Sequence, residues 1–291
     1  MSTPLVAAPA SPEATTGSAG LGRQAVLAAV ATAVLAVTAS VGPGALLGGV
    51  AVLQAGIVLG AVFATGSPGR WGGILIAGVA AAGADVAVSV WPTSALSPLL
   101  AVLGLTVPAL FVHQLTRGVV RARVVESLSA IALLVVAGAA ATGYVQLRNE
   151  FGGRRMALAV ILAVGVALVL AQLCDLVRDR PRLDTEVARG VPALVVGLVA
   201  GAVTSGLLLR DQAGFDLLAA VALGAGLGLL TAFLSVAAGY AEHGLATAVA
   251  PNTPDFSVVH RPVAALRPVF LALLPLALLG PVAYVLALAL G

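Results

Sequence analysis

Apolar stretches long enough to cross a lipid bilayer follow one another along almost the whole chain. The segment from Gln24 to Gly69 alone contains 46 residues and no charged side chain. A transmembrane helix needs about 20 predominantly apolar residues, so this segment is long enough for two spans. Charged residues make up only 9% of the 291, against about 25% in a soluble domain. The sequence therefore predicts an all-α fold, a polytopic transmembrane helix bundle.

Glycine, proline and short polar segments divide the apolar sequence into nine predicted spans. The first break is the segment Ser-Val-Gly-Pro-Gly at 40–44, because Gly and Pro interrupt helices. Residues 1–22 contain one charge, Glu13, and are expected to form a disordered cytoplasmic tail. Residues 23–291 are expected to form a single transmembrane domain. The predicted spans are 24–41, 45–65, 71–91, 96–115, 125–146, 156–176, 191–209, 216–240 and 267–289.

The distribution of arginine predicts how these spans are oriented. If the N-terminal tail is cytoplasmic, the inside segments contain 11 arginines and the outside loops contain four. Basic residues favour the cytoplasmic side, so we expect the C-terminus outside and a location in the bacterial cytoplasmic membrane. The loop from Arg148 to Arg155 is the exception, since it is basic on the outside. A cleaved signal peptide is an alternative for the first span, because Val37-Thr38-Ala39 resembles a cleavage site.

Composition also excludes several kinds of protein. All 15 basic residues are arginine, so no mechanism that needs a lysine applies. Cys174 is the only cysteine, which excludes an intrachain disulfide and a cysteine-based metal cluster. The basic residues lie in short loops between spans, where they set topology, and nucleic-acid binding is not expected. Neither a cofactor nor a metal site is expected.

Asp85 is the only acidic residue that falls well inside a predicted span. Its span lies between Trp71 and Trp91, the only two tryptophans of the chain, and tryptophan favours the membrane interfaces. At 1.5 Å per residue, Asp85 lies about 9 Å below the Trp91 end. A carboxyl group at that depth is costly unless it is protonated, paired or hydrated, which makes it a functional candidate.

Small residues on the helix face of Asp85 would let another helix or water approach it. Gly78, Ala81 and Ala82 lie on that face. Asp85 is therefore predicted either to carry a proton or cation during transport, or to form a structural hydrogen bond with a neighbouring helix. No charged residue is expected at the same depth. The neutral partners that the sequence offers are Gln54, Thr204 and Ser205.

A basic stripe is predicted at the cytoplasmic end of the fourth span. If that helix continues past Gly118, His113, Arg117 and Arg121 follow one another at four-residue intervals and share one face. Such a stripe suits anionic lipid headgroups or a phosphate ligand. The alternative interpretation is an ordinary positive-inside anchor whose arginines extend to the interface.

Two predicted cytoplasmic loops contain enough polar residues to be considered as a metal site or an active site. The loop 175–189 has four carboxylates, which suit a divalent cation, and four arginines, which would neutralise them. We therefore expect a solvated loop whose charges pair with one another. The longest inside loop runs from Glu242 to Arg261 and offers the acid, base and arginine of an interfacial active site, although no recognised spacing connects these residues.

Pairs of glycine four residues apart predict close helix contacts, because they let two backbones approach each other. The pairs are Gly56/Gly60, Gly197/Gly201 and Gly224/Gly228. They are expected to serve helix packing, and they also offer faces for a membrane-protein partner or a second copy of the chain. Gly224 to Gly228 is not a dinucleotide-binding loop, because no strand precedes it.

The segment that begins with His-Gln-Leu at 113–115 continues with Arg-Ala-Arg-Val-Val-Glu-Ser-Leu at 121–128. This segment and the Ala-, Gly- and Val-rich spans resemble uncharacterised polytopic membrane proteins of actinobacterial type, a likeness that implies no activity. The many-span layout is also faintly similar to phosphatidate cytidylyltransferases. Their signature, rich in lysine, aspartate and His-Gly-Gly, is not matched, since the chain has no lysine and Leu245 follows His243-Gly244. No catalytic residue is therefore carried over.

These observations favour a non-enzymatic membrane protein that moves a small solute, ion or lipid, with Asp85 as the candidate coupling residue. A second hypothesis is a lipid-metabolising enzyme in which Arg117 and Arg121 hold a phosphate. A third is a structural or assembly partner that docks another membrane protein through its small-residue faces. The expected partners are the lipid bilayer and anionic headgroups.

Overall fold

The computed structural model describes residues 13–65, 70–92, 96–116, 124–150, 153–177, 181, 189–212, 215–248 and 264–290. These residues form ten α-helices and one short 3₁₀ helix, and nine spans among them are long and apolar enough to cross a membrane. The predicted all-α transmembrane bundle is thereby confirmed. The helices are α1 (Glu13–Val41), α2 (Pro43–Thr65), α3 (Arg70–Val90), α4 (Ser97–Thr116), α5 (Val124–Ala141), α6 (Gly143–Glu150), α7 (Arg154–Val177), α8 (Val191–Leu209), α9 (Leu217–Ala248), η1 (Ala264–Leu266) and α10 (Arg267–Leu290).

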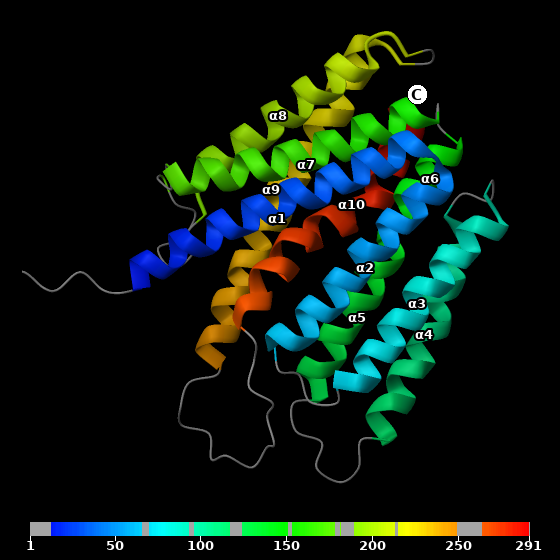
Figure 1. Cartoon of the computed structure of the whole chain (residues 1–291), viewed down its shortest axis with the longest axis vertical. Helices are drawn as coiled ribbons and strands as arrows, with labels where there is room; N and C mark the ends of the chain where they lie inside the picture. Colours follow the sequence, from blue (N-terminus) through cyan, green and yellow to red (C-terminus); the bar gives the residue numbers. More distant parts are fainter. Residues whose placement is uncertain are drawn as a thin grey trace, which may run out of the picture.

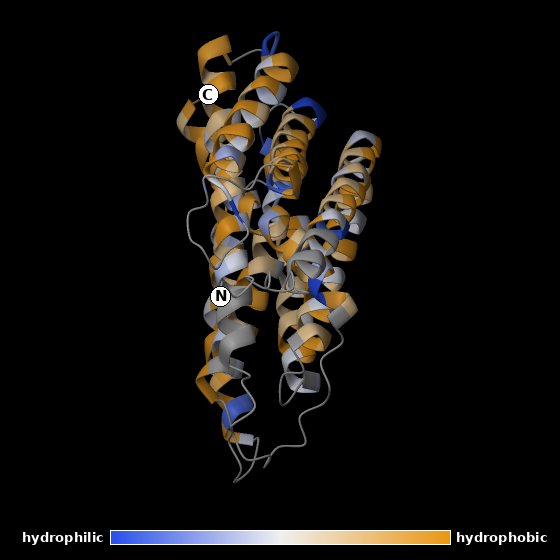
Figure 2. Ribbon diagram, turned by 90° about the vertical axis from the view of Figure 1, so that its left-hand side faces the viewer, coloured by the Kyte–Doolittle hydropathy of each residue, from blue (hydrophilic) through white to orange (hydrophobic). Residues whose placement is uncertain are grey.

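The helices form two groups that α10 joins (Figure 1). Helices α1, α7, α8 and α9 pack together on one side, and α2, α3, α4 and α5 pack together on the other. Helix α10 lies between the groups and contacts α1, α2, α5, α6 and α9. Hydrophobic residues run along the length of the helices (Figure 2), as expected where their outer faces meet lipid rather than water.

The first helix begins earlier than the sequence indicated. Residues 13–22 belong to α1, although they were expected to be part of a disordered tail. Elongating an existing helix is far easier than starting one, and the membrane-spanning part of α1 provides the helix to which this segment is added. The rest of the predicted tail, residues 1–12, lies outside the described residues.

The fifth predicted span is divided into α5 and α6 at Thr142, where α10 crosses it. A Cβ atom placed on Gly143 would lie 2.6 Å from the carbonyl carbon of Gly280 in α10. The Tyr144 hydroxyl donates a hydrogen bond of 2.6 Å to the Leu276 carbonyl oxygen. The two backbones therefore touch at the break, which requires glycine on both sides.

The predicted glycine pairs are helix contacts within the chain. A Cβ atom on Gly201 would lie 2.2 Å from the Gly224 carbonyl oxygen, and one on Gly228 would lie 2.1 Å from the Gly197 carbonyl oxygen. The third pair, Gly56/Gly60, faces Leu273 and Phe270 of α10. Helices of the same chain fill all three faces, so an interface with another protein through them would require these helices to separate.

Candidate functional site

Asp85 lies near the C-terminal end of α3 and is bound from a neighbouring helix. The Gln54 side chain in α2 donates a hydrogen bond of 3.0 Å from Nε2 to Asp85 Oδ1. The same nitrogen donates a second bond of 3.0 Å to the Gly138 carbonyl oxygen in α5. An amide nitrogen has two hydrogens, so both are used and the amide orientation is fixed.

Gln54 was one of three neutral partners predicted for Asp85, and this prediction is confirmed. The other two predictions are wrong. Thr204 and Ser205 are in α8, and the Thr204 hydroxyl donates to the Ala200 carbonyl oxygen of its own helix at 2.7 Å. Neither hydroxyl bonds to Asp85. Among the described residues, no basic side chain forms an ion pair with Asp85 and Oδ2 has no hydrogen-bond partner.

A groove of about 300 Å³ lies between α2 and α3, with Asp85 and Gln54 in its wall. The other lining residues are apolar, and they include the predicted small face of α3. A Cβ atom placed on Gly78 would meet nothing within 4 Å, so this glycine leaves open space along the groove, about two helical turns before Asp85. The lining residues are Ala51, Gln54, Ala55, Val58, Leu59, Ile74, Gly78, Ala81, Ala82 and Asp85.

The predicted basic stripe falls mostly outside the described residues. Arg117 and Arg121 belong to the segment 117–123, which is not described, so their relation to His113 stays a prediction. His113 itself is near the end of α4 and packs against α3, where a Cβ atom on Gly72 would lie 2.1 Å from His113 Cε1. The absence of a side chain at Gly72 thus leaves the space that the His113 ring occupies against α3.

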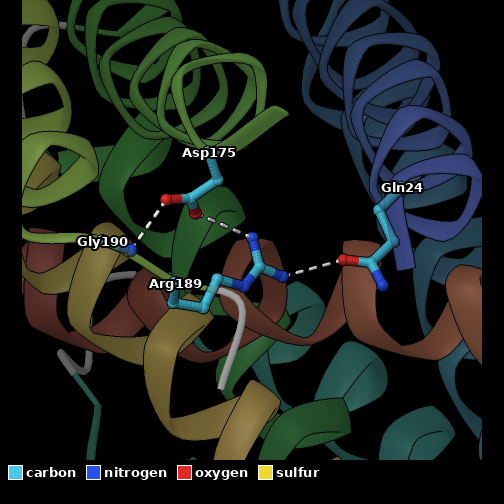
Figure 3. A network of polar contacts seen from close by, with 4 residues as sticks. All are labelled: Gln24, Asp175, Arg189 and Gly190. Atoms are coloured by element: carbon cyan, nitrogen blue, oxygen red, sulfur yellow. Dashed lines mark hydrogen bonds and ion pairs between the residues drawn. The ribbon is translucent and has the colours of Figure 1, made fainter. Parts of the chain in front are cut away.

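A buried polar network that the sequence analysis did not predict connects α1, α7 and the start of α8 (Figure 3). Arg189 Nη1 donates to Asp175 Oδ2 at 3.3 Å, and Arg189 Nη2 donates to Gln24 Oε1 at 2.9 Å. The Gly190 backbone N–H donates to Asp175 Oδ1 at 2.9 Å. Each of the three side chains belongs to a residue that is at most 5% exposed.

This network corrects one expectation about the loop 175–189. Pairing of its charges is confirmed for Asp175 and Arg189, but solvation of these two residues is wrong, because both are buried. The sequence places Asp175 at the end of the predicted span 156–176 and Arg189 two residues before the span 191–209, but these positions do not indicate that the two residues pair or are buried. Residues 178–180 and 182–188 lie outside the described part of the chain.

A second polar cluster that was not predicted lies at the opposite end of the bundle. Gln146 in α6 donates from Nε2 to the Pro92 carbonyl oxygen at 2.8 Å and to Glu150 Oε1 at 2.7 Å. The Tyr284 hydroxyl in α10 donates to Glu150 Oε2. These bonds connect α6 with α10 and with the segment that follows α3, and no ligand-binding role follows from them.

The described residues give no support for a metal site, or for an active site in the loop between Glu242 and Arg261. Within them, no group of three or more His, Cys, Asp or Glu residues is placed to hold a metal ion. The alternative active site between Glu242 and Arg261 lies outside the residues whose side chains are described.

No protein-family model, no curated protein and no solved structure matches this chain. The function is therefore argued from the chemistry of the site alone.

Proposed function

We propose that this protein transports a small solute, ion or lipid across the bacterial cytoplasmic membrane, with Asp85 as the coupling residue. The supporting observation is a buried carboxyl group in a membrane span, on a residue that lines a groove, with only Oδ1 bonded to Gln54. Ionisable residues inside spans are expensive to place there and mark pathways for substrates, ions or protons. The groove gives this carboxyl group a space in which a substrate can reach it.

The hydrogen bonds around Asp85 favour this role over a purely structural one. A structural tie is best made when every oxygen of a buried carboxyl group has a partner. Here Gln54 binds only Oδ1, and Gln54 is itself fixed by the Gly138 carbonyl oxygen. The scaffold thus holds one oxygen rigidly and leaves the other oxygen for a proton or a substrate.

Replacing Asp85 by asparagine is expected to reduce transport at least about ten-fold while the protein still folds and inserts. Asparagine retains an oxygen that accepts the Gln54 hydrogen bond, but it can neither bind nor release a proton and has no negative charge. The measurement is the transient current of proteoliposomes on a solid-supported membrane, recorded while a panel of solutes is added to the wild type and the variant.

The matched control is Asp211→Asn, which changes the same functional group outside the groove. The Asp211 side chain is 75% exposed, and its replacement is expected to leave the currents unchanged. If the wild type gives currents and Asp85→Asn gives the same ones, Asp85 has no coupling role. If neither protein gives a current above empty liposomes with any solute or imposed ion gradient, transport that moves net charge, including proton-coupled transport through Asp85, is contradicted.

A further inference from the structure

We propose that the groove between α2 and α3 binds an organic cation with an apolar body, which enters it sideways from the bilayer. This inference rests on the proposed transport function and names its substrate class. Three properties of the groove support it: the side on which it opens, the apolar nature of most of its lining and the carboxyl group in its wall.

The groove opens on the outer face of the bundle. Five of its lining residues are exposed, namely Ala51, Ala55, Leu59, Gly78 and Ala82. The residues that flank this mouth on α2 and α3 are large, apolar and exposed, for example Val52 at 67%, Leu75 at 65% and Val79 at 64%. In a membrane span, exposed apolar side chains face hydrocarbon, so the mouth faces lipid and not an aqueous pore.

The walls of the groove are suited to an apolar group of limited size. Eight of the ten lining residues are Ala, Gly, Val, Leu or Ile, and a volume of about 300 Å³ is at the small end of the range for ligand pockets. A bound proton alone would need no such space. The groove therefore favours a molecule with an apolar body over a bare ion.

The carboxyl group in the wall of the groove selects a positive group. Asp85 is the only ionisable residue in the lining, and Oδ2 is the oxygen that Gln54 leaves open. An anion would find no donor there, because both N–H groups of Gln54 are already bonded. A cation beside Oδ2 would form the ion pair that a buried carboxylate requires.

The first test compares two probes of the same shape that differ in charge. Benzyltrimethylammonium has a quaternary nitrogen where neopentylbenzene has a carbon, so the pair isolates the positive charge. Titration calorimetry of the full-length protein in lipid nanodiscs is expected to show saturable binding of the cation and none of the neutral compound. Saturable binding of both with similar affinity, or of neither, would overturn the proposal, and this comparison requires no variant.

The second test uses two glycine-to-leucine variants with the cation as the probe. Gly78→Leu places a side chain in the open space of the groove and is expected to weaken binding at least about ten-fold. Gly104→Leu is the control, because Gly104 is exposed on α4, away from the groove, and a Cβ atom there also meets nothing within 4 Å. Asp85→Asn is expected to weaken binding by a similar factor. Unchanged affinity in Gly78→Leu or in Asp85→Asn contradicts the site.

Binding and transport can fail separately. If the cation binds at Asp85 but no solute or ion is moved, the binding site stands and the proposed transport function fails. If Asp85-dependent currents occur with other solutes and the cation does not bind, transport stands and the substrate class proposed here fails.

Discussion

Arg189→Ala is expected to lower the free energy of unfolding by about 3–5 kcal/mol. The substitution removes the guanidinium group of a buried ion pair and with it the Nη1 donor 3.3 Å from Asp175 Oδ2. It also leaves the Gln24 side-chain oxygen without its donor. The measurement is equilibrium unfolding in mixed micelles with increasing dodecyl sulfate, followed by circular dichroism.

The chain provides a close control for this prediction. Arg210 and Asp211 form an ion pair with the same N–O distance of 3.3 Å, but their side chains are 61% and 75% exposed. Because water and salt screen such a pair, Arg210→Ala is expected to change the free energy of unfolding by less than about 1 kcal/mol. Equal losses in the two arginine variants would show that burial of the network contributes nothing to stability.

A double variant separates the charge effect from lost packing. Asp175→Asn combined with Arg189→Ala removes both charges of this pair, so the buried carboxylate that Arg189 contacts is no longer present. We expect the double variant to be more stable than Arg189→Ala alone, because breaking one side of a buried pair costs more than removing both. A double variant less stable than Arg189→Ala would contradict this account.

Gly201→Leu is expected to lower the free energy of unfolding by about 3 kcal/mol or more. Even the first carbon of the new side chain would lie 2.2 Å from the Gly224 carbonyl oxygen. Because that oxygen belongs to the backbone, no rotamer change relieves the overlap, and α8 and α9 must move apart. The same unfolding experiment in mixed micelles measures the loss.

Gly104→Leu again serves as the control, since it adds the same side chain to an exposed position with open space around it. It is expected to change the free energy of unfolding by less than about 0.5 kcal/mol. If Gly201→Leu were as stable as Gly104→Leu, the close approach of α8 and α9 would not be required for stability.

Much of the fold could be predicted from the sequence, because transmembrane spans follow from local composition. The nine spans and the packing role of the glycine pairs are of this kind. The division of the fifth span at Thr142 could not be predicted in this way. The break lies where Gly143 meets Gly280, which is far along the chain, and hydropathy does not report which helices become neighbours.

The polar residues of the structure also fall into two sets, one that could be predicted from the sequence and one that could not. Asp85 and Gln54 could be found from the sequence because each is a polar residue inside an apolar span. The network of Gln24, Asp175 and Arg189 could not, because polar residues at span ends look like ordinary interfacial anchors. Only the folded structure shows that Gln24 and Arg189, 165 positions apart, form a hydrogen bond.

The central position of α10 has a consequence for biosynthesis. Chains are made from the N-terminus, so the helix that joins the two helical groups enters the membrane after all the other described helices. Until then, Tyr144 and Glu150 have no α10 partner for the bonds that they share with Leu276 and Tyr284. The two groups are therefore inserted first with an incomplete interface between them, and α10 completes that interface when it is inserted.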